Sequence, residues 1–306
     1  MTNQQVFAEG GAFRGLSVAA VTPLGPDGAV DYPGMRRHAR WLADGGVDVI
    51  MPCGTTGEGA TLEPEEQRRV IAACLEEVGD EIPVVAGAGT NATNHALALV
   101  RAAVEEGAHG ILCVTPYYNR PSQEGLHRHF SAVSDAAGGI PVILYNVPGR
   151  TGVNMTAETA LRLAELEPVV GIKEASGDLS QVMEILRNRP EGFGVLAGDD
   201  ILALPLTALG GDGVVSVTAN EAPGRMAALV RAALEGRMDE ARRAHFELLP
   251  LFHANFIDTN PVPVKAALEL MGRMDARVRL PLAPLAAKHR EVLRAALEST
   301  GVLEAD

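Results

Sequence analysis

Eight short apolar runs, each followed by a stretch with helical periodicity, constrain the fold of this chain more than any other feature. Eight successive β and α units within residues 15–237 are what a (β/α)8 TIM barrel of about 250 residues requires. A doubly wound open sheet is the competing α/β architecture, but regular spacing without a domain break favours the closed barrel. The runs are GLSVAAVTP, VDVIMPCGTTGE, IPVVAGAGTN, GILCVTPYYN, IPVILYNVP, VVGIKEAS, FGVLAGDD and GVVSVTAN.

The stretches between the runs have the start and stop signals of crossover helices. EPEEQRRVIAACLEEVG places Pro64 where a helix begins, and NATNHALALVRAAVEEGA ends before Gly107. Residues 238–306 also have helical patterns, interrupted by prolines, and predict a helical C-terminal domain. Residues 1–14 precede the first run and are predicted to form an N-terminal extension.

The composition is that of an ordinary globular protein. Hydrophobic residues make up 47% and charged residues 21%, and the net charge is −13 with acidic and basic residues intermixed. Such a charge distribution argues against binding to nucleic acid or to an anionic membrane. The N-terminal segment lacks the apolar stretch of a signal peptide, and no segment approaches the ~20 apolar residues of a membrane span. We expect a cytoplasmic protein.

The cysteines and histidines do not have the spacing of a metal site. Cys53, Cys74 and Cys113 include no CxxC pair, and we expect them to be buried thiols. His127 and His129 are two apart on a predicted helix, so they point to different faces. We predict that no metal is bound.

One segment partly resembles a nucleotide-binding motif. GAGTNA, residues 87–92, lies between a strand and a helix and partly fits a dinucleotide fingerprint. The acidic ribose partner about 20 residues further on is missing, so no cofactor is expected. Asp199 and Asp200 open a helical stretch and are predicted to cap it.

Lys173 interrupts the apolar sixth run, VVGIKEAS. With a period of two, Gly171, Lys173 and Ala175 share one face of the strand, and Ile172 and Glu174 share the other. A lysine with an exposed end would be the simpler interpretation. If the small residues mark the inner face, Lys173 points into the barrel mouth, where desolvation favours a neutral amine that can attack a carbonyl to form a Schiff base.

Other polar groups end the neighbouring strands. Tyr145 could move protons during imine chemistry, although a tyrosine that packs its ring at the rim and leaves its hydroxyl in water is the commoner case for any single tyrosine. The loop GTTG at 54–57 offers hydroxyls and amides that suit a carboxylate, or it is simply a tight turn. Arg150 could bind a second carboxylate with two N–H groups, or it could be solvated.

Five motifs, in order from about residue 15 to the C-terminus, resemble the dihydrodipicolinate synthase group of pyruvate-dependent class I aldolases and lyases: GTTGE, TPYYNRPSQEGL, YNVPGRTG, GIKEASG and GVVSVTAN. The resemblance implies that Lys173 forms the Schiff base with pyruvate and that Tyr145 is the general acid/base. Thr55 would relay protons between Tyr145 and a second tyrosine, and Thr56 would hold the pyruvate carboxylate.

The resemblance also implies roles for residues further from the imine. The backbone of Val215 would lie beside pyruvate, and Arg150 would bind the carboxylate of aspartate semialdehyde. Tyr118 would be the relay tyrosine that a neighbouring subunit donates. Because family members are typically tetramers built from two such dimers, we expect a homotetramer.

The expected activity is the condensation of pyruvate with L-aspartate 4-semialdehyde to 4-hydroxy-tetrahydrodipicolinate, in lysine and diaminopimelate biosynthesis. The alternative is a related pyruvate aldolase that acts on N-acetylneuraminate or a 2-keto-3-deoxy sugar acid. Arg150, followed by Thr151 and Gly152, argues against a polyol aldehyde, which has no carboxylate at that end. A barrel that only binds or scaffolds would not need the lysine, the tyrosine and both threonines.

Feedback inhibition by lysine is a further property of some family members. Sensitive bacterial members carry histidines at the positions of Pro64 and Gln67 and a glutamate at that of His95. Without that carboxylate the effector's ammonium loses its counter-charge, so we expect weak or absent inhibition. The positions that match the effector site are Gly59, Ala60, Pro64, Gln67, Asn91, His95 and Tyr117.

Overall fold

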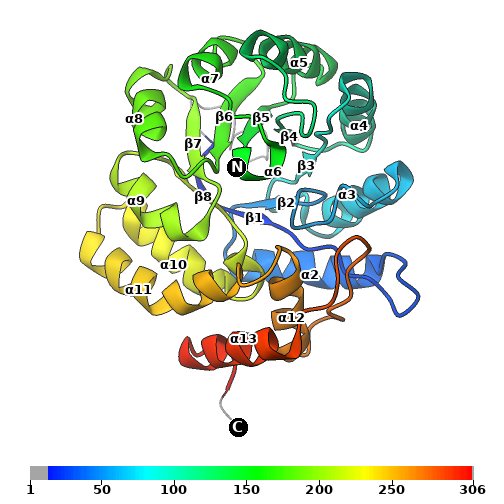
Figure 1. Ribbon diagram of the computed structural model, residues 1–306, viewed down its shortest axis with the longest axis vertical. Helices are drawn as coiled ribbons and strands as arrows, with labels where there is room; N and C mark the ends of the chain where they lie inside the picture. The colour runs from blue at the N-terminus through cyan, green and yellow to red at the C-terminus, as the bar shows by residue number, and fades with distance from the viewer. Residues whose placement is uncertain (1–12, 305–306) are drawn as a thin grey trace.

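The computed structural model describes residues 13–304 and contains eight parallel strands in one sheet (Figure 1). The strand order is β2-β1-β8-β7-β6-β5-β4-β3. A parallel bridge between Ile50 and Val84 joins the two ends of this order, so the sheet closes into a barrel. The prediction of a TIM barrel is confirmed. The strands are β1 (Gly15–Ala19), β2 (Val49–Met51), β3 (Val85–Gly87), β4 (Gly110–Val114), β5 (Val142–Asn146), β6 (Val169–Glu174), β7 (Gly194–Ala197) and β8 (Gly213–Ser216).

Helices surround the barrel and begin where the sequence indicates. Pro64 occupies the first turn of α3, where the side chain of Glu66 accepts from the amide of Glu63 at 2.9 Å in a capping box. The helices are α2 (Tyr32–Asp44), α3 (Pro64–Val78), α4 (Thr93–Glu105), α5 (Gln123–Ala136), α6 (Pro148–Thr151), α7 (Ala157–Leu163), α8 (Leu179–Asn188), α9 (Ala203–Ala208), α10 (Pro223–Leu234), α11 (Met238–Ala254), α12 (Val262–Leu270) and α13 (Ala287–Ser299), with 3₁₀ turns η1 (Asp200–Leu202) and η2 (Thr218–Asn220).

Two apolar cores lie on opposite faces of the strands. Ile172 and Val214 pack outward against the helices, whereas Leu196 and Val215 pack inside the barrel. Phe13, which precedes the predicted start of the barrel, is also buried in the inner core. From Gly171 onward in β6, and along β8, the side chains alternate between the two cores as the period of two predicts. A register shift at the start of β6 places Val170 toward the inner core.

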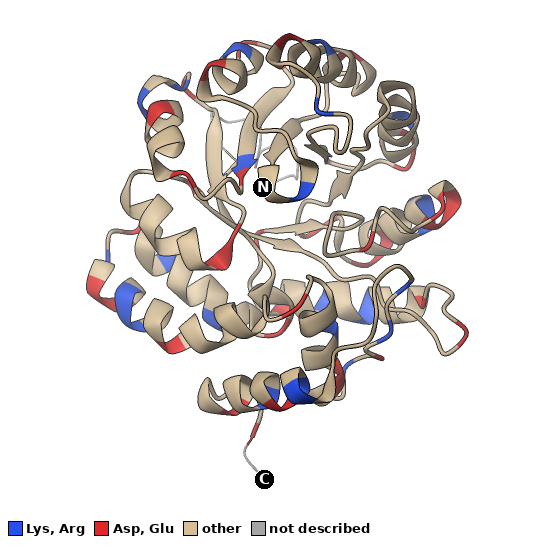
Figure 2. Ribbon diagram, viewed as in Figure 1, with Lys and Arg blue, Asp and Glu red and all other residues tan. Residues whose placement is uncertain are grey.

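The C-terminal helices stack against one side of the barrel, where α11 packs on α10 and α13 on α11 and α12 (Figure 1). Acidic and basic residues are interspersed along the outer helices (Figure 2). The three cysteines are buried, as expected. Within residues 13–304, none of the helices combines the length and the apolar character needed to cross a membrane.

Candidate active site

Lys173 lies on β6 with its side chain on the inner face of the barrel. It is 4% exposed, and its Nζ lies 4.3 Å from the centroid of the Tyr145 ring. Tyr145 is its direct neighbour on β5 and is 6% exposed. A Cβ at Gly198 would lie 3.2 Å from Cγ of Lys173, so the glycine leaves room for the lysine. No hydrogen bond or ion pair joins the side-chain amine of Lys173 to another described residue.

The outer face of the same strand pair holds the lysine and the tyrosine in register. Asn146 pairs with Glu174, one position beyond Tyr145 and Lys173. The Nδ2 of Asn146 donates to Oε2 of Glu174 at 3.0 Å, and the amide of Ser176 donates to Oε1 at 2.6 Å. These bonds lie between the barrel and the helices, so they fix the strand ends without entering the site.

The loop after β2 presents the two threonines. Thr56 is 1% exposed, and its Oγ1 accepts a hydrogen bond from Nδ2 of Asn260 at 3.0 Å. Because that oxygen is used as an acceptor, its own proton is free to be donated to a ligand. Thr55 is partly exposed and lines the cavity described below. Among the described residues, the hydroxyl of Tyr145 forms no hydrogen bond with Thr55.

Arg150 lies on the short helix α6, which ends at Gly152 with a left-handed φ of 74°. Its side chain is exposed, and its Nη2 donates to the backbone oxygen of Asn260 at 3.3 Å. Asn260 is therefore hydrogen-bonded both to Thr56, in the loop after β2, and to Arg150, on α6. The remaining N–H groups of Arg150 are available for a carboxylate.

A cavity of about 680 Å³ opens at the carboxyl ends of the strands. Tyr145, Thr55, Arg150 and Asn260 line it, whereas Lys173, Thr56 and Val215 lie behind the lining. Val215 is fully buried on β8 in the inner core that also contains Tyr145. The cavity extends toward α3 and α4, where its lining includes six positions of the effector set named above: Gly59, Ala60, Pro64, Gln67, His95 and Tyr117.

Tyr118 does not contribute to the cavity of its own chain. Its side chain is 88% exposed, and its backbone has a left-handed φ of 75°. The amide of Tyr118 donates to the backbone oxygen of Thr151 at 3.1 Å, which fixes the loop beside α6. The preceding residue, Tyr117, faces inward instead, with its hydroxyl 3.2 Å from Oγ1 of Thr90.

Comparison with known proteins covers almost the whole chain. Residues 12–300 match the model of the dihydrodipicolinate synthetase family. A 4-hydroxy-tetrahydrodipicolinate synthase from Chlorobium limicola is 50% identical over 94% of this chain and 98% of its own length. The chain belongs to the dihydrodipicolinate synthetase family.

Solved structures of family members have the same fold. Dihydrodipicolinate synthase from Aquifex aeolicus is 42% identical with a TM-score of 0.93, covering 96% of this chain and 100% of its own. The enzyme from Cyanidioschyzon merolae, solved with lysine bound, is 41% identical with a TM-score of 0.93, covering 95% of this chain and 99% of its own.

The two aspartates that the sequence assigns to capping have different surroundings. Asp199 caps η1 through a bond from the amide of Ile201 at 3.2 Å, as predicted. Burial raises the pKa of Asp199, while the charges of His253 and Lys173 oppose that rise. Asp199 is therefore a carboxyl group near the lysine, a role that its position in the sequence did not indicate.

Asp200 is buried and binds the segment after β8. Its Oδ2 accepts from the amides of Val217 at 3.1 Å and Thr218 at 2.8 Å, and burial raises its pKa. Asp200 thus fixes the end of the strand that carries Val215.

The described residues contain no group of three His, Cys, Asp or Glu side chains that could hold a metal. His129 is bonded to Thr93, with Nδ1 3.0 Å from Oγ1, and burial lowers its pKa to about 4. His127 lies two residues earlier on the same helix. The site therefore offers an amine, hydroxyls and a guanidinium as its reactive and binding groups.

Asn260 is the site residue that sequence analysis missed. It lies between α11 and α12, in a region predicted only as helices, and no motif marks it. Its buried Oδ1 has no hydrogen-bond partner among the described residues and is free to accept from a ligand or a water. The sequence there has a polar residue before a proline and lacks helical periodicity, which together indicate a loop. Neither feature indicates that Asn260 lies beside Thr56.

Proposed function

We propose that this chain is a 4-hydroxy-tetrahydrodipicolinate synthase, a lyase of lysine biosynthesis that condenses pyruvate with L-aspartate 4-semialdehyde. The supporting observation is Lys173, buried against Tyr145 at the mouth of a barrel whose sequence and fold match this family over nearly their full length. The enzyme acts in the cytoplasm and needs no metal or other cofactor.

Lys173 supplies the nucleophile. Its amine attacks the C2 carbonyl of pyruvate, and loss of water gives an imine. Removal of a C3 proton then gives an enamine, whose C3 forms the new bond to the aldehyde carbon of the second substrate. The amine of that substrate finally displaces Lys173 from C2, which closes the ring and frees the enzyme.

Tyr145 moves the protons that these steps require. It lies on the adjacent strand, directly beside Lys173. Thr55 connects it to a second tyrosine through hydrogen bonds that tighten when substrate fills the cavity, because catalytic bonds are often long in an empty site. That second tyrosine is Tyr118 of a neighbouring subunit, in keeping with the exposure of the Tyr118 ring on its own chain. We propose a homotetramer built from two such dimers.

Two carboxylates are held at different depths. The free hydroxyl proton of Thr56 and nearby amides bind the pyruvate carboxylate, with the backbone of Val215 beside the keto acid. Arg150 lies nearer the opening of the cavity and binds the carboxylate of the semialdehyde.

Borohydride trapping tests the Schiff base directly. Reduction in the presence of pyruvate should leave a pyruvyl adduct on the peptide that contains Lys173, measured by mass spectrometry. An unmodified Lys173 peptide under conditions that support turnover would refute the mechanism. Absence of both adduct and turnover would favour a binding or scaffold protein.

Replacement of Arg150 by Ala tests the second substrate. Loss of a charge-assisted contact should lower kcat/KM for aspartate semialdehyde by at least ~30-fold, while the pyruvyl adduct still forms. Arg150→Lys should restore little, because an ammonium lacks the two-pronged geometry. Should the wild type prefer N-acetylmannosamine or another neutral sugar aldehyde, the alternative aldolase function would be correct.

A further inference from the structure

An ion pair almost without solvent exposure lies behind the threonine loop. Nζ of Lys265, on α12, lies 2.6 Å from Oε1 of Glu58, and the two side chains are 0% and 3% exposed. Burial lowers the pKa of Lys265, while Glu58 opposes this effect. Replacing such a pair by apolar residues is often neutral or stabilising, so its presence calls for an explanation other than stability.

Glu58 belongs to the same tight loop as Thr55 and Thr56. Its amide donates to the backbone oxygen of Thr55 at 3.1 Å, and its own backbone has a left-handed φ of 52°. A non-glycine residue in that conformation costs on the order of 1 kcal/mol and persists only where its surroundings hold it. The side-chain bonds of Glu58 provide that restraint.

Lys265 also reaches the loop by a second route. Its Nζ donates to the backbone oxygen of Thr22 at 3.0 Å, and Oγ1 of Thr22 donates to the backbone oxygen of Gly57 at 2.7 Å. Gly57 lies between Thr56 and Glu58, so the ammonium restrains the loop from both sides. The helix α12 begins just after Asn260, whose side chain contacts Thr56. A shift of α12 would therefore move Thr56.

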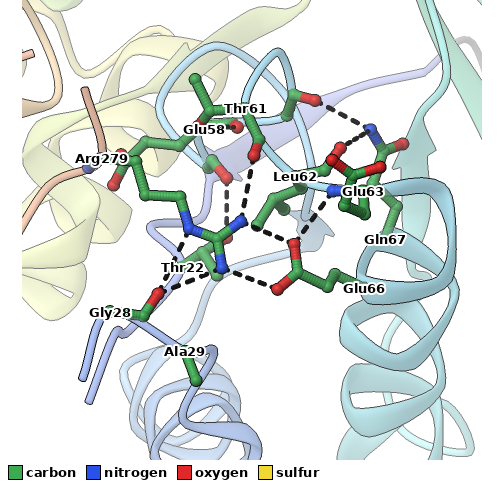
Figure 3. Close-up of polar contacts among 12 residues, drawn as sticks. Thr22, Gly28, Ala29, Glu58, Thr61, Leu62, Glu63, Glu66, Gln67 and Arg279 are labelled. Atoms are coloured by element: carbon green, nitrogen blue, oxygen red, sulfur yellow. Dashed lines mark hydrogen bonds and ion pairs between the residues drawn. The ribbon is translucent and has the colours of Figure 1, made fainter. Parts of the chain in front are cut away.

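Arg279 completes the cluster, and Figure 3 shows its guanidinium between Gly28 and Glu66. Its backbone amide donates to Oε2 of Glu58 at 2.9 Å. Its guanidinium binds both oxygens of Glu66 at 2.6 Å and the backbone oxygens of Gly28 and Thr61. Although Glu58 borders the cavity, both its oxygens are engaged by protein donors.

We propose that Glu58, Lys265 and Arg279 are positioning residues for the keto-acid carboxylate site, acting through the loop that carries Thr55 and Thr56. This inference rests on the proposed function. None of the three contacts substrate. They fix the loop to α12 and to the segment before α13, so that the hydroxyl of Thr56 lies at the correct distance from Lys173 before pyruvate arrives.

The test measures how much pyruvate is needed to trap Lys173. The wild type is compared with Glu58→Gln, Lys265→Met and the double variant by borohydride reduction over a range of pyruvate concentrations. Half-saturating pyruvate should rise about tenfold in all three variants, because small misplacements of binding groups cost this much or more. Trapping at saturating pyruvate should stay within about twofold, since Lys173 itself is unchanged.

Arg189→Met is the matched control. Arg189 forms a partly buried ion pair with Asp212 near the amino ends of β7 and β8. This end of the barrel is the one away from the cavity, which opens at the carboxyl ends of the strands. This variant should lose stability but keep the half-saturating pyruvate of the wild type. An equal rise in the control would mean that general loosening causes the effect, and would overturn the inference.

The double variant keeps the test decisive even if the single variants fail to fold. It removes both buried charges together, so its melting temperature should be near that of the wild type. A double variant with wild-type half-saturation would show that the pair has only a structural role, and the inference would be wrong. An adduct missing from the wild type would instead refute the proposed function itself.

Discussion

Lys173 and Lys265 are both buried, but the regions around them differ. Lys265, on α12, donates to Glu58 and to the backbone of Thr22. Lys173, inside the mouth of the barrel, has an aromatic ring beside it and no carboxylate or carbonyl bonded to its amine among the residues described. A buried ammonium is costly unless it is paired, and only the surroundings of Lys265 supply such partners among the described residues.

The difference separates structural from chemical use of a buried lysine. The amine of Lys265 donates to a carboxylate and to a backbone carbonyl, and these two bonds hold it in place. Around Lys173, the unused amine is positioned beside a phenol and a cavity that substrate can enter. Burial raises the pKa of Asp199 and the charge of Lys173 acts to lower it, so the two groups are near each other although no bond joins their side chains.

The largest expected effect comes from Lys173→Met. We expect kcat/KM to fall by at least about 10³-fold because the nucleophile is lost. The free energy of unfolding should not fall by more than about 1 kcal/mol, since methionine replaces an amine that has no partner. Steady-state kinetics and urea unfolding measure the two quantities. A large loss of stability would show that Lys173 is as fully paired as Lys265.

Lys265→Met should mainly lower stability, whereas Lys173→Met should mainly lower activity. It leaves the carboxylate of Glu58 buried without its cation, which should lower the free energy of unfolding by about 3 to 5 kcal/mol. Adding Glu58→Gln should recover most of this loss. Urea unfolding of the two single variants and the double variant gives the coupling energy, and additive effects would contradict the pairing described here.

Tyr145→Phe tests whether the hydroxyl beside Lys173 transfers protons during the reaction. Phenylalanine keeps the ring beside the amine but removes the hydroxyl, so we expect kcat to fall about 10²-fold as for loss of a general acid/base. The fold should be unaffected, because the hydroxyl has no hydrogen-bond partner in the described part of the chain. Near-normal kcat would show that another group carries the protons.

His38 is a buried basic side chain like Lys173 and Lys265, and its titration gives the smallest effect that we predict, a pH dependence of stability. Burial lowers its pKa to about 4, although its bond to Asn220, 2.9 Å from Nε2 to Oδ1, acts in the other direction. In the unfolded chain the imidazole of His38 is protonated below about pH 6.5, whereas in the folded protein it stays neutral until about pH 4. The free energy of unfolding therefore falls as the pH falls from about 6.5 toward 4.

The corresponding measurement compares the wild type with His38→Gln, which does not titrate in this range. Between about pH 7 and pH 5, the wild type should lose about 2 kcal/mol more than the variant. Equal losses in the two proteins would show that His38 is protonated in the folded state.

Much of the fold and the centre of the site could be predicted from local pattern. Eight apolar runs gave eight strands, and the period of two placed Lys173 and Glu174 on opposite faces of one strand. The structure shows that Lys173 lies on the inner face, beside Tyr145. The parallel order then brought Tyr145 beside Lys173. The roles of these residues, the division into domains and the response to lysine stay predictions.

The sequence by itself determined the barrel and which residues share a face with Lys173, because both follow from periodicity over a few neighbouring residues. Only the tertiary structure decided what surrounds the threonine loop. Asn260 lies 204 residues from Thr56, and Lys265 lies 207 residues from Glu58. No local pattern encodes such pairs, since they form only when closure of the barrel and packing of α12 bring the two ends of the chain together.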